Sequence, residues 1–516
     1  MTTYSYPGVY IQEVNTGNKP IEGVSTSIVG FLGIAERGPT AATFISSYAD
    51  FVRSFGTYYK DAKSNQAYLA YAVEGFFLNG GEQCWIARVT SIDAANPAKT
   101  AITKIGANFT ISAAGPGAYA GQLGFQILKA SSTPNDPTTF RLEAYYWANA
   151  TLAATKDPTK AFQTEVFDNL STSPTSSMYF VGVVSSGSNL VTVSQPAVGN
   201  VPVTATSLLD GTNGTPGNDG TPLVLADFEG SIVDPTNLSG LAALAALDDV
   251  SILCCPDENA IQPKGTIAQQ LQAQCETLKD RFAILQCGAN EGKPSGVAPS
   301  SISTTGYTAY YYPWINVVDP TTDLITPIPP GGHIAGIYAR SDENENVAKD
   351  PANEQILGID SIQIPIDNNT QGILNPIGVN CLRYFKGQGN LVWGGRTTAS
   401  DPDWKYINVR RLFIFVEKSL QQGTQWVVFE PNDTPTWARV IRSVDAFLTT
   451  LWLQDMLQGA TKDQAFFVRC DRTTMTQADI DNGRLIVVVG IAPVKPAEFV
   501  IFQIGQWSGG SSISES

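Results

Sequence analysis

Apolar residues along the 516-residue chain follow two kinds of spacing. In three stretches they recur every three or four residues, which predicts helices with one buried face. These stretches are residues 66–79, 408–422 and 436–458, and the first is followed by Gly80-Gly81, a left-handed helix stop. Elsewhere apolar residues form short unbroken runs, which are typical of buried strands. The runs on either side of the first helix read STSIVGFLGIAERGP and QCWIARV.

Residues 249–287 predict a strand, a helix and a second strand. The strands read DVSILCCP and RFAILQC, and the helix between them places Ile267, Leu271, Cys275 and Leu278 on one face. A helical crossover implies that the two strands pair in parallel. YTAYYYPWINVVDP adds another strand, so we expect an α/β domain at the centre of the chain.

The amino-acid composition changes between residues 95 and 225. Charged residues become fewer there, and Ser, Thr, Gly, Pro and Asn surround short strand-like runs. Three of these runs are FQILKA, FRLEAYYW and MYFVGVV. Turn-rich spacing of this kind indicates a mostly β domain inserted into the α/β domain. The last third is helical and then β, with strands in AFFVRCD, RLIVVVGIAP and AEFVIFQIGQW. The expected fold is therefore α+β around an α/β core, in several domains.

The last of these strands raises a question about its partner. Phe499, Ile501 and Trp507 alternate with Val500, Phe502 and Ile504, so both faces are apolar. An uncovered strand of this kind is a sticky edge. It closes a sheet either in its own domain or in another molecule, and on alternation alone its own domain is favoured.

Charge and cysteine content narrow the class of protein. The net charge of −15 argues against a general nucleic-acid-binding surface. Residues 226–360 hold 18 acidic and 6 basic residues, whereas residues 361–516 hold 14 of each, so the C-terminal part could meet an acidic partner.

The seven cysteines form no CxxC pair and are expected as buried thiols in a reducing compartment. The N-terminus resembles no signal peptide and no stretch approaches a membrane span, so we expect cytoplasmic synthesis without membrane insertion.

A search for catalytic chemistry finds no convincing active site. His333 is the single histidine and has no nucleophile elbow to serve, so a structural or exposed side chain is the simpler interpretation. CGANEGKPS fails as a phosphate loop, because its glycines are one residue too close. Asp342, Glu343, Glu345 and Asp350 lie in an acidic stretch that we interpret as solvated rather than calcium-binding. For Arg410-Arg411 we expect pairing with local acids such as Glu417. No cofactor, metal or enzymatic activity is expected.

Several stretches together resemble the single-chain sheath proteins of contractile phage tails and phage-tail-like injection systems. The resemblance covers roughly residues 1–94 and 226–507, and the inserted segment carries no family motif. The stretches that carry it are YPGVYIQEV, STSIVGFLGIAERGP, AVEGFFLNGGEQCWIARV, PPGGHIAGIYARSD, LNPIGVNCLRYF, VWGGRTTASDPDWKYINVRRL, VFEPN, AFFVRCD and DIDNGRLIVVVGIAPVKPAEFVIFQIGQW.

The resemblance implies a domain plan and two exchanged strands. It implies an N-terminal arm over 1–20, a central domain over 21–94 and 226–365, an outer domain over 95–225, a tube-facing domain over 366–492 and a C-terminal arm over 493–516. Both arms would complete sheets in neighbouring subunits. The N-terminal arm residues are Tyr6, Val9, Tyr10, Ile11 and Val14, and those of the C-terminal arm are Phe499, Val500, Ile501, Phe502, Ile504 and Trp507. Pro7-Gly8 and Pro493–Pro496 are expected as elbows before the arms.

The implied function is that of a structural subunit which polymerises helically around an inner tube and contracts without nucleotide hydrolysis. The implied partners are further copies of the chain, the inner tube protein, and baseplate and terminal cap proteins. The candidate tube contact is the turn and helix at 471–483 with nearby Lys462, and it comprises Lys462, Arg472, Thr476, Gln477 and Asp479. A capped connector is an equally good interpretation of that segment. Two alternatives stay open, a sheath paralogue that acts as cap or baseplate adaptor, and an α/β hydrolase or binding protein with an inserted β domain.

Overall fold

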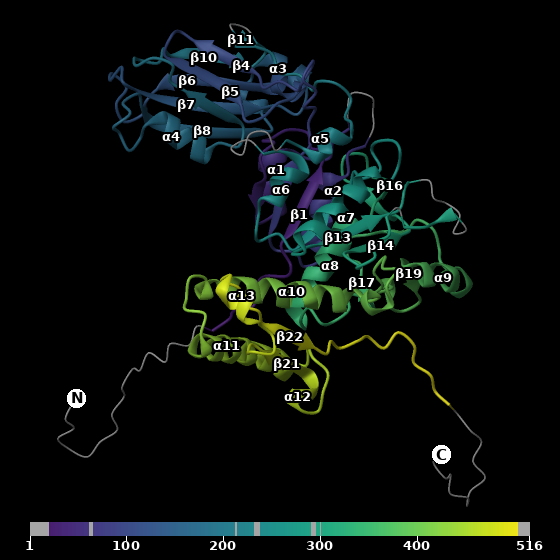
Figure 1. The fold of residues 1–516 in the computed structure, drawn as a ribbon. Helices are drawn as coiled ribbons and strands as arrows, with labels where there is room; N and C mark the ends of the chain where they lie inside the picture. Colours follow the sequence, from purple (N-terminus) through teal and green to yellow (C-terminus); the bar gives the residue numbers. More distant parts are fainter. Residues whose placement is uncertain are drawn as a thin grey trace, which may run out of the picture.

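The computed structural model describes residues 20–60, 66–211, 214–231, 238–289, 296–299 and 301–503. These residues form three bodies along the molecule (Figure 1). At one end lies a sandwich of two sheets, in the middle a sheet with helices on both faces, and at the other end a group of helices with a small sheet. The mixed class with an α/β core, which the sequence predicts, is confirmed.

A nine-stranded sheet forms the central body. Six neighbouring strands, β3, β1, β12, β13, β14 and β19, pair in parallel, and the other three extend the sheet antiparallel at its two ends. The order across the sheet is β17 (Glu354–Gln355), β20 (Gly389–Trp393), β19 (Val379–Phe385), β14 (Thr308–Tyr312), β13 (Phe282–Gln286), β12 (Ile252–Cys254), β1 (Val29–Gly33), β3 (Cys84–Arg88) and β2 (Thr43–Ile45). The predicted parallel pairing of DVSILCCP with RFAILQC is confirmed, as β12 with β13.

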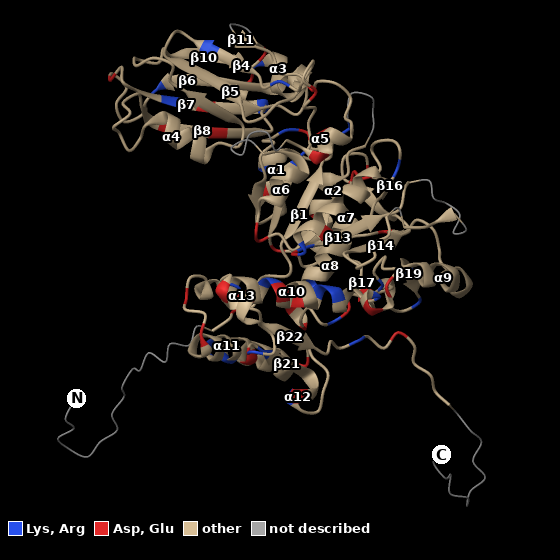
Figure 2. Cartoon of the chain, viewed as in Figure 1, with Lys and Arg blue, Asp and Glu red and all other residues tan. Residues whose placement is uncertain are grey.

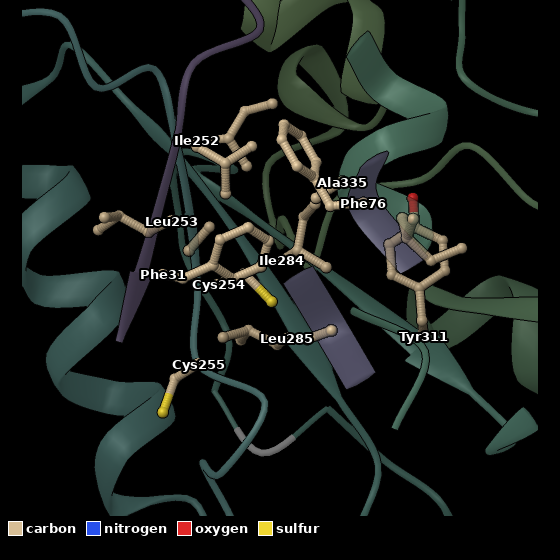
Figure 3. Close-up of a cluster of buried hydrophobic side chains, with 14 of the residues drawn as sticks. Phe31, Phe76, Ile252, Leu253, Cys254, Cys255, Ile284, Leu285, Tyr311 and Ala335 are labelled. Carbon is tan, nitrogen blue, oxygen red and sulfur yellow. The ribbon is translucent and has the colours of Figure 1, made fainter. Parts of the chain in front are cut away.

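Helices cover both faces of this sheet. Cys254 of β12 faces α8, whereas the neighbouring Leu253 faces the side of α6, as alternation along a strand requires. Figure 3 shows apolar side chains of this core, among them Phe31 of β1, which meets Phe76 of α2 edge to face. The helices of the central body are α1 (Tyr48–Phe55), α2 (Leu69–Leu78), α5 (Leu225–Glu229), α6 (Gly240–Ala245), α7 (Thr266–Leu278), α8 (Gly331–Asn344) and α9 (Asn368–Leu374). The predicted face of α7 is buried except for Leu278 at its end.

The segment between residues 95 and 225 forms the sandwich. Its two four-stranded antiparallel sheets enclose a hydrophobic core separate from that of the central sheet. One sheet contains β10 (Thr204–Leu208), β6 (Leu123–Lys129), β7 (Thr139–Tyr146) and β8 (Gln163–Ser171), and the other contains β11 (Gly214–Thr215), β4 (Ile102–Ile105), β5 (Phe109–Ala113) and β9 (Val191–Ser194). Two helices, α3 (Ala150–Thr155) and α4 (Phe180–Gly187), accompany them.

Two short runs differ from the sequence prediction. MYFVGVV was expected as a strand, but it forms the start of α4, with Phe180 and Val184 buried one helical turn apart. A short run that is apolar at nearly every position has no periodicity to separate the two structures. YTAYYYPWINVVDP forms two strands, because Pro313 cannot donate to a continuing ladder. The second, β15 (Ile315–Asp319), joins a separate antiparallel sheet with β16 (Leu324–Ile328) and β18 (Ser361–Ile362).

The C-terminal body consists of two long helices and a two-stranded sheet. Its elements are α10 (Ile407–Gly423), α11 (Thr434–Leu453), α12 (Lys462–Ala465), β21 (Phe466–Arg469), α13 (Gln477–Asp481) and β22 (Val488–Ile491). The apolar faces predicted for the long helices meet in one core that includes Leu412, Val444 and Leu448. β19 and β20, which lie within the segment 366–492 assigned to this domain from the sequence, belong to the central sheet instead. Among the described residues no helix is long and apolar enough to cross a membrane.

A buried ion pair and further contacts of α10 join the C-terminal body to the central body. Arg411 of α10 donates to both carboxylate oxygens of Asp342 of α8, at 2.8 and 2.6 Å, and the two side chains are only 3% and 6% exposed. The guanidinium of Arg410 lies over the ring of Trp404, and its Nε donates to the carbonyl of Thr305. The expected pairing of these arginines with local acids is therefore wrong for Arg411, whose partner lies 69 residues earlier in the chain.

The acidic stretch at 341–351 is also only partly solvated. Glu343 and Glu345 are exposed, as predicted, but Asp342 is paired at the end of α8 and Asp350 is buried. Whether a carboxylate is buried depends on segments from elsewhere in the fold, which local sequence does not reveal. His333 lies buried within α8. All seven cysteines are buried, as predicted, and no disulfide joins any of these described residues.

Candidate assembly interface

The small sheet of the C-terminal body is incomplete. β21 and β22 pair antiparallel, from Phe466 opposite Ile491 to Arg469 opposite Val488. One face of the pair packs into the core with α11, whereas Phe467 and Val488 are exposed. Within the part of the chain that the structure describes, no third strand pairs with either one. Two strands alone are marginally stable and present unpaired backbone groups on both edges, so the sheet can accept further strands.

The C-terminal segment supplies a strand-like run without a partner. Phe499, Val500, Ile501 and Phe502 are 70–83% exposed, and the described residues up to Gln503 pair with no strand. Pairing within its own domain, which alternation alone favours, is therefore absent over the described part of this run. Ile504 and Trp507, also predicted for the C-terminal arm, lie outside the described residues. Four consecutive apolar side chains in solvent are unusual for a surface and indicate a site of association.

The predicted N-terminal arm lies outside the described residues, with Tyr6, Val9, Tyr10, Ile11 and Val14. The structure does place the residues that follow it. Ile21 is buried in the C-terminal core against Gly423, at the end of α10, and the backbone N–H of Val24 donates to Ser419. The first described residues of the chain thus pack in the same body that carries the incomplete sheet.

The first residues of the C-terminal arm contact the rest of the subunit. Pro493 pairs with Leu457, and the side chain of Asn408 donates to the carbonyl of Val494 at 2.9 Å. Glu498 is held by Arg396 of the central body. The Pro493–Pro496 segment, expected as a stiff elbow before the arm, is held by these contacts at Pro493 and Val494. Sequence reasoning missed Asn408 and Glu498, because their partners lie 86 and 102 residues away.

Of the five residues predicted for the tube contact, four lie together and Lys462 lies on another helix. Thr476 and Asp479 form a capping box at the start of α13, and Arg472 donates to Gln477 at 2.7 Å. These four residues therefore form one capped turn. Lys462 lies on α12, where it forms an ion pair with Asp445 of α11. Figure 2 shows basic and acidic residues interspersed over the C-terminal body, without a field of a single sign.

A cavity of about 710 Å³, which bears on an enzymatic alternative, lies at the carboxyl ends of β1, β3 and β12. The buried charged groups that line it form hydrogen bonds with backbone groups of the fold. Asp257 accepts hydrogen bonds from the backbone N–H groups of Ile34 and Tyr68, and burial raises the pKa of its carboxyl to about 6. Arg88 donates to three backbone carbonyls. His333 lies elsewhere, with a pKa lowered to about 4 by burial. No group of three potential metal ligands occurs among the described residues.

Comparison with known proteins points to one family. The phage tail sheath protein central domain matches residues 234–398, and the phage tail sheath C-terminal domain matches residues 399–506. The chain is 28% identical over 287 residues to a tail sheath protein of Vibrio phage KVP40, and 24% identical over 266 residues to a putative prophage major tail sheath protein of Pseudomonas aeruginosa. These alignments cover 51% and 50% of this chain but only 41% and 65% of the relatives.

Solved structures share the fold along nearly the whole chain. The sheath of an extracellular contractile injection system, PVC, in its contracted state superposes with a TM-score of 0.58 and 23% identity, covering 98% of this chain and 99% of that one. The contracted helical sheath of the anti-feeding prophage gives a TM-score of 0.57 at the same identity, covering 98% and 100%. The two family matches together span more than half of the chain. The chain therefore belongs to the phage tail sheath protein family.

Proposed function

We propose that this chain is the repeating subunit of a contractile sheath that assembles helically around an inner tube and shortens to drive the tube through a target envelope. The observation that carries the proposal is the presence, in one chain, of an uncovered apolar run and an incomplete sheet. Phe499–Phe502 are exposed and unpaired, and β21–β22 has an unpaired edge on each side within the described part of the chain. Family membership and the likeness of fold to contracted sheaths support it.

In this proposal the arms of neighbouring subunits complete the sheet. The C-terminal arm of one copy and the N-terminal arm of another add one strand each to β21–β22, which gives four strands. Backbone hydrogen bonds supply the affinity, and alternating apolar side chains set the register. The subunits are thereby linked into a mesh that keeps its connections while its packing changes.

The driving force is a difference in free energy between two packings of the lattice. The extended packing is metastable, and each subunit gains intersubunit contacts as it moves to the shorter one. A gain of even a few kcal/mol per subunit, multiplied over many copies, exceeds the stability of a whole domain many times. The proposed partners besides further copies are an inner tube protein, contacted through the turn at 471–483, and baseplate and terminal cap proteins. The assembly would be a phage tail or a phage-tail-like particle made in the cytoplasm.

The test compares three chains by negative-stain electron microscopy and sedimentation, namely the full chain, a chain ending after Glu498 and a control ending after Trp507. The first truncation removes the exposed run but keeps residues 493–498, and the control removes only the last nine residues. We expect long striated tubes from the full chain and the control, and only small particles from the chain that ends after Glu498.

Either of two other results would count against the proposal. Tubes from all three chains would support a sheath but remove the linking role of Phe499–Trp507. Small particles from all three, also after co-expression with the tube protein of the same system, would contradict the sheath function.

A further inference from the structure

The side chain of Glu498 sits in a cradle of five donor groups. Arg396 donates from Nε to Oε1 at 2.7 Å and from Nη2 to Oε2 at 2.8 Å, and Asn375 donates to Oε1 at 2.6 Å. Lys405 Nζ and the Tyr406 hydroxyl each donate to Oε2 at 3.2 Å. Paired, charge-assisted hydrogen bonds of this kind give strong and directional recognition of a carboxylate. Despite partial burial, which opposes ionisation, the donors from Arg396 and Asn375 lower the pKa of Glu498 to about 2.

The cradle is anchored in the central sheet. Asn380, a fully buried residue of β19, donates to the carbonyl of Arg396 at 2.7 Å and accepts from its backbone N–H at 2.8 Å. Arg396 also donates to the carbonyl of Asn375 and pairs with Tyr406 through a β-bridge. Arg396, Lys405 and Tyr406 thus come from the connection between β20 and α10, which is tied to β19, and Asn375 comes from the end of α9.

Glu498 marks the boundary between attached and unattached chain. Before it, Pro493 and Val494 are held by Leu457 and Asn408, and directly after it Phe499 is exposed. Figure 1 shows the chain leaving β22, running beside the central body and then extending away from the protein. The arm accordingly departs from the border of the central sheet, several residues beyond the small sheet.

We propose that Glu498 is a positioning residue that fixes the point from which the exchanged strand leaves the subunit. This inference rests on the proposed sheath function. Together with the contacts at Pro493 and Val494, the cradle shortens the free connection to the neighbouring subunit by holding the chain up to Glu498. A shorter connection of the right span raises the effective concentration of the strand at its acceptor. A short connection also stretches little, so a movement of the central body moves the linked neighbouring subunit with it.

The first measurement detects the attachment in the unassembled subunit. Single cysteines at Ala497→Cys and Ile501→Cys carry a spin label, since the seven native cysteines are buried. We expect low label mobility at residue 497 and high mobility at 501. Glu498→Gln and Arg396→Gln should raise the mobility at 497 to that at 501, whereas Glu343→Gln, a change at an exposed acid, should leave it unchanged. Equal mobility at the two positions in the parent chain would overturn the attachment.

The second measurement is the critical concentration for polymerisation. Release of Glu498 frees the chain back to Val494, and a free connection of doubled length lowers the effective concentration about threefold. Glu498→Gln and Arg396→Gln should therefore raise the critical concentration about threefold or more, with the thermal midpoint of the unassembled subunit close to that of the parent. Polymerisation of both variants at the parent concentration would overturn the positioning role. A parent chain that forms no polymer would instead contradict the sheath function, while the label mobility still reports whether the cradle holds Glu498.

Discussion

At the scale of single residues, Asp350 shows how the fold changes the chemistry of an ordinary side chain. Its carboxyl is buried beside Gly395, and its Oδ1 has no hydrogen-bond partner among the described residues. Burial is the main cause that raises the pKa of Asp350 to about 8, and the nearby Glu498 acts in the same direction. Lys349 and Arg411 oppose the shift without cancelling it. Near neutral pH the folded protein therefore holds a proton on this carboxyl that the unfolded chain releases.

The pH dependence of stability follows from this difference. The pKa of Asp350 is higher in the folded state than in the unfolded state, so its contribution weakens as the pH rises from about 4 to about 8. Asp350→Asn should remove this slope and raise the free energy of unfolding at pH 8 by about 1–3 kcal/mol, with little change near pH 4. Urea unfolding at the two pH values measures it, with the exposed Asp481→Asn as control. An equal effect of Asp350→Asn at both pH values would contradict the prediction.

At the scale of elements, the contact between α2 and α8 depends on glycine. A Cβ atom at Gly332 would lie 2.2 Å from the carbonyl oxygen of Ala72, and one at Gly336 would lie 2.4 Å from that of Phe76. The four-residue spacing places both glycines on one face of α8, which lets the two helix backbones approach closely. On α2, Gly75 leaves room for the buried ring of His333 in the same way. These contacts explain the GGHIAG sequence as a packing motif. They also explain His333 as a buried side chain that packs against α2.

Gly336→Ala should therefore destabilise the central body by about 3 kcal/mol, because the obstructing atom belongs to the backbone of another helix and cannot move away. Gly372→Ala in α9 is the matched control, since no atom lies within 4 Å of the position that its new Cβ would take and alanine favours a helix by up to about 1 kcal/mol. Thermal unfolding followed by circular dichroism compares the two. Similar midpoints for both variants would show that the helices can separate at little cost.

At the scale of the whole molecule, the sandwich is inserted into the chain of the central body and has its own core. The two have separate hydrophobic cores. The chain leaves and re-enters the central body at one place, where the hydroxyls of Ser91 and Thr221 lie 2.9 Å apart. The polar contacts between the two bodies include the hydrogen bond of Arg37 with Gln163. This arrangement suits an outer domain whose removal leaves the elements proposed for assembly in place.

Replacing residues 95–219 with a short Gly-Ser linker should leave the central and C-terminal bodies folded, because a flexible linker closes the short gap at little entropic cost. If the sheath function holds, the shortened chain still forms tubes, and their outer diameter is smaller than that of the parent. Circular dichroism and electron microscopy measure the two outcomes. A full-length chain with the same linker inserted after Asp93 is the control. Loss of folding in the shortened chain alone would show that the central body needs the sandwich.

Much of the local structure could be predicted from the sequence, because it depends on neighbours along the chain. The periodic apolar faces of α10 and α11 indicate which side of each helix packs into the core, and the unbroken runs of β1, β12 and β13 indicate strands that are buried on both faces. The crossover in residues 249–287 implied parallel pairing for the same reason. The sequence also predicts a strand at Phe499–Phe502, and these residues are exposed and pair with no strand within the described part of the chain.

Only the tertiary structure decided which residues meet across long separations. It placed β19 and β20 in the central sheet, paired Arg411 with Asp342 and buried Asp350 in what the sequence suggested was a solvated stretch. Over the described residues it also left both edges of β21–β22 unpaired and fixed the departure of the arm at Glu498. The physical reason is the same in each case. Periodicity records whether a side chain is buried, whereas the identity of its partner depends on how distant segments pack together.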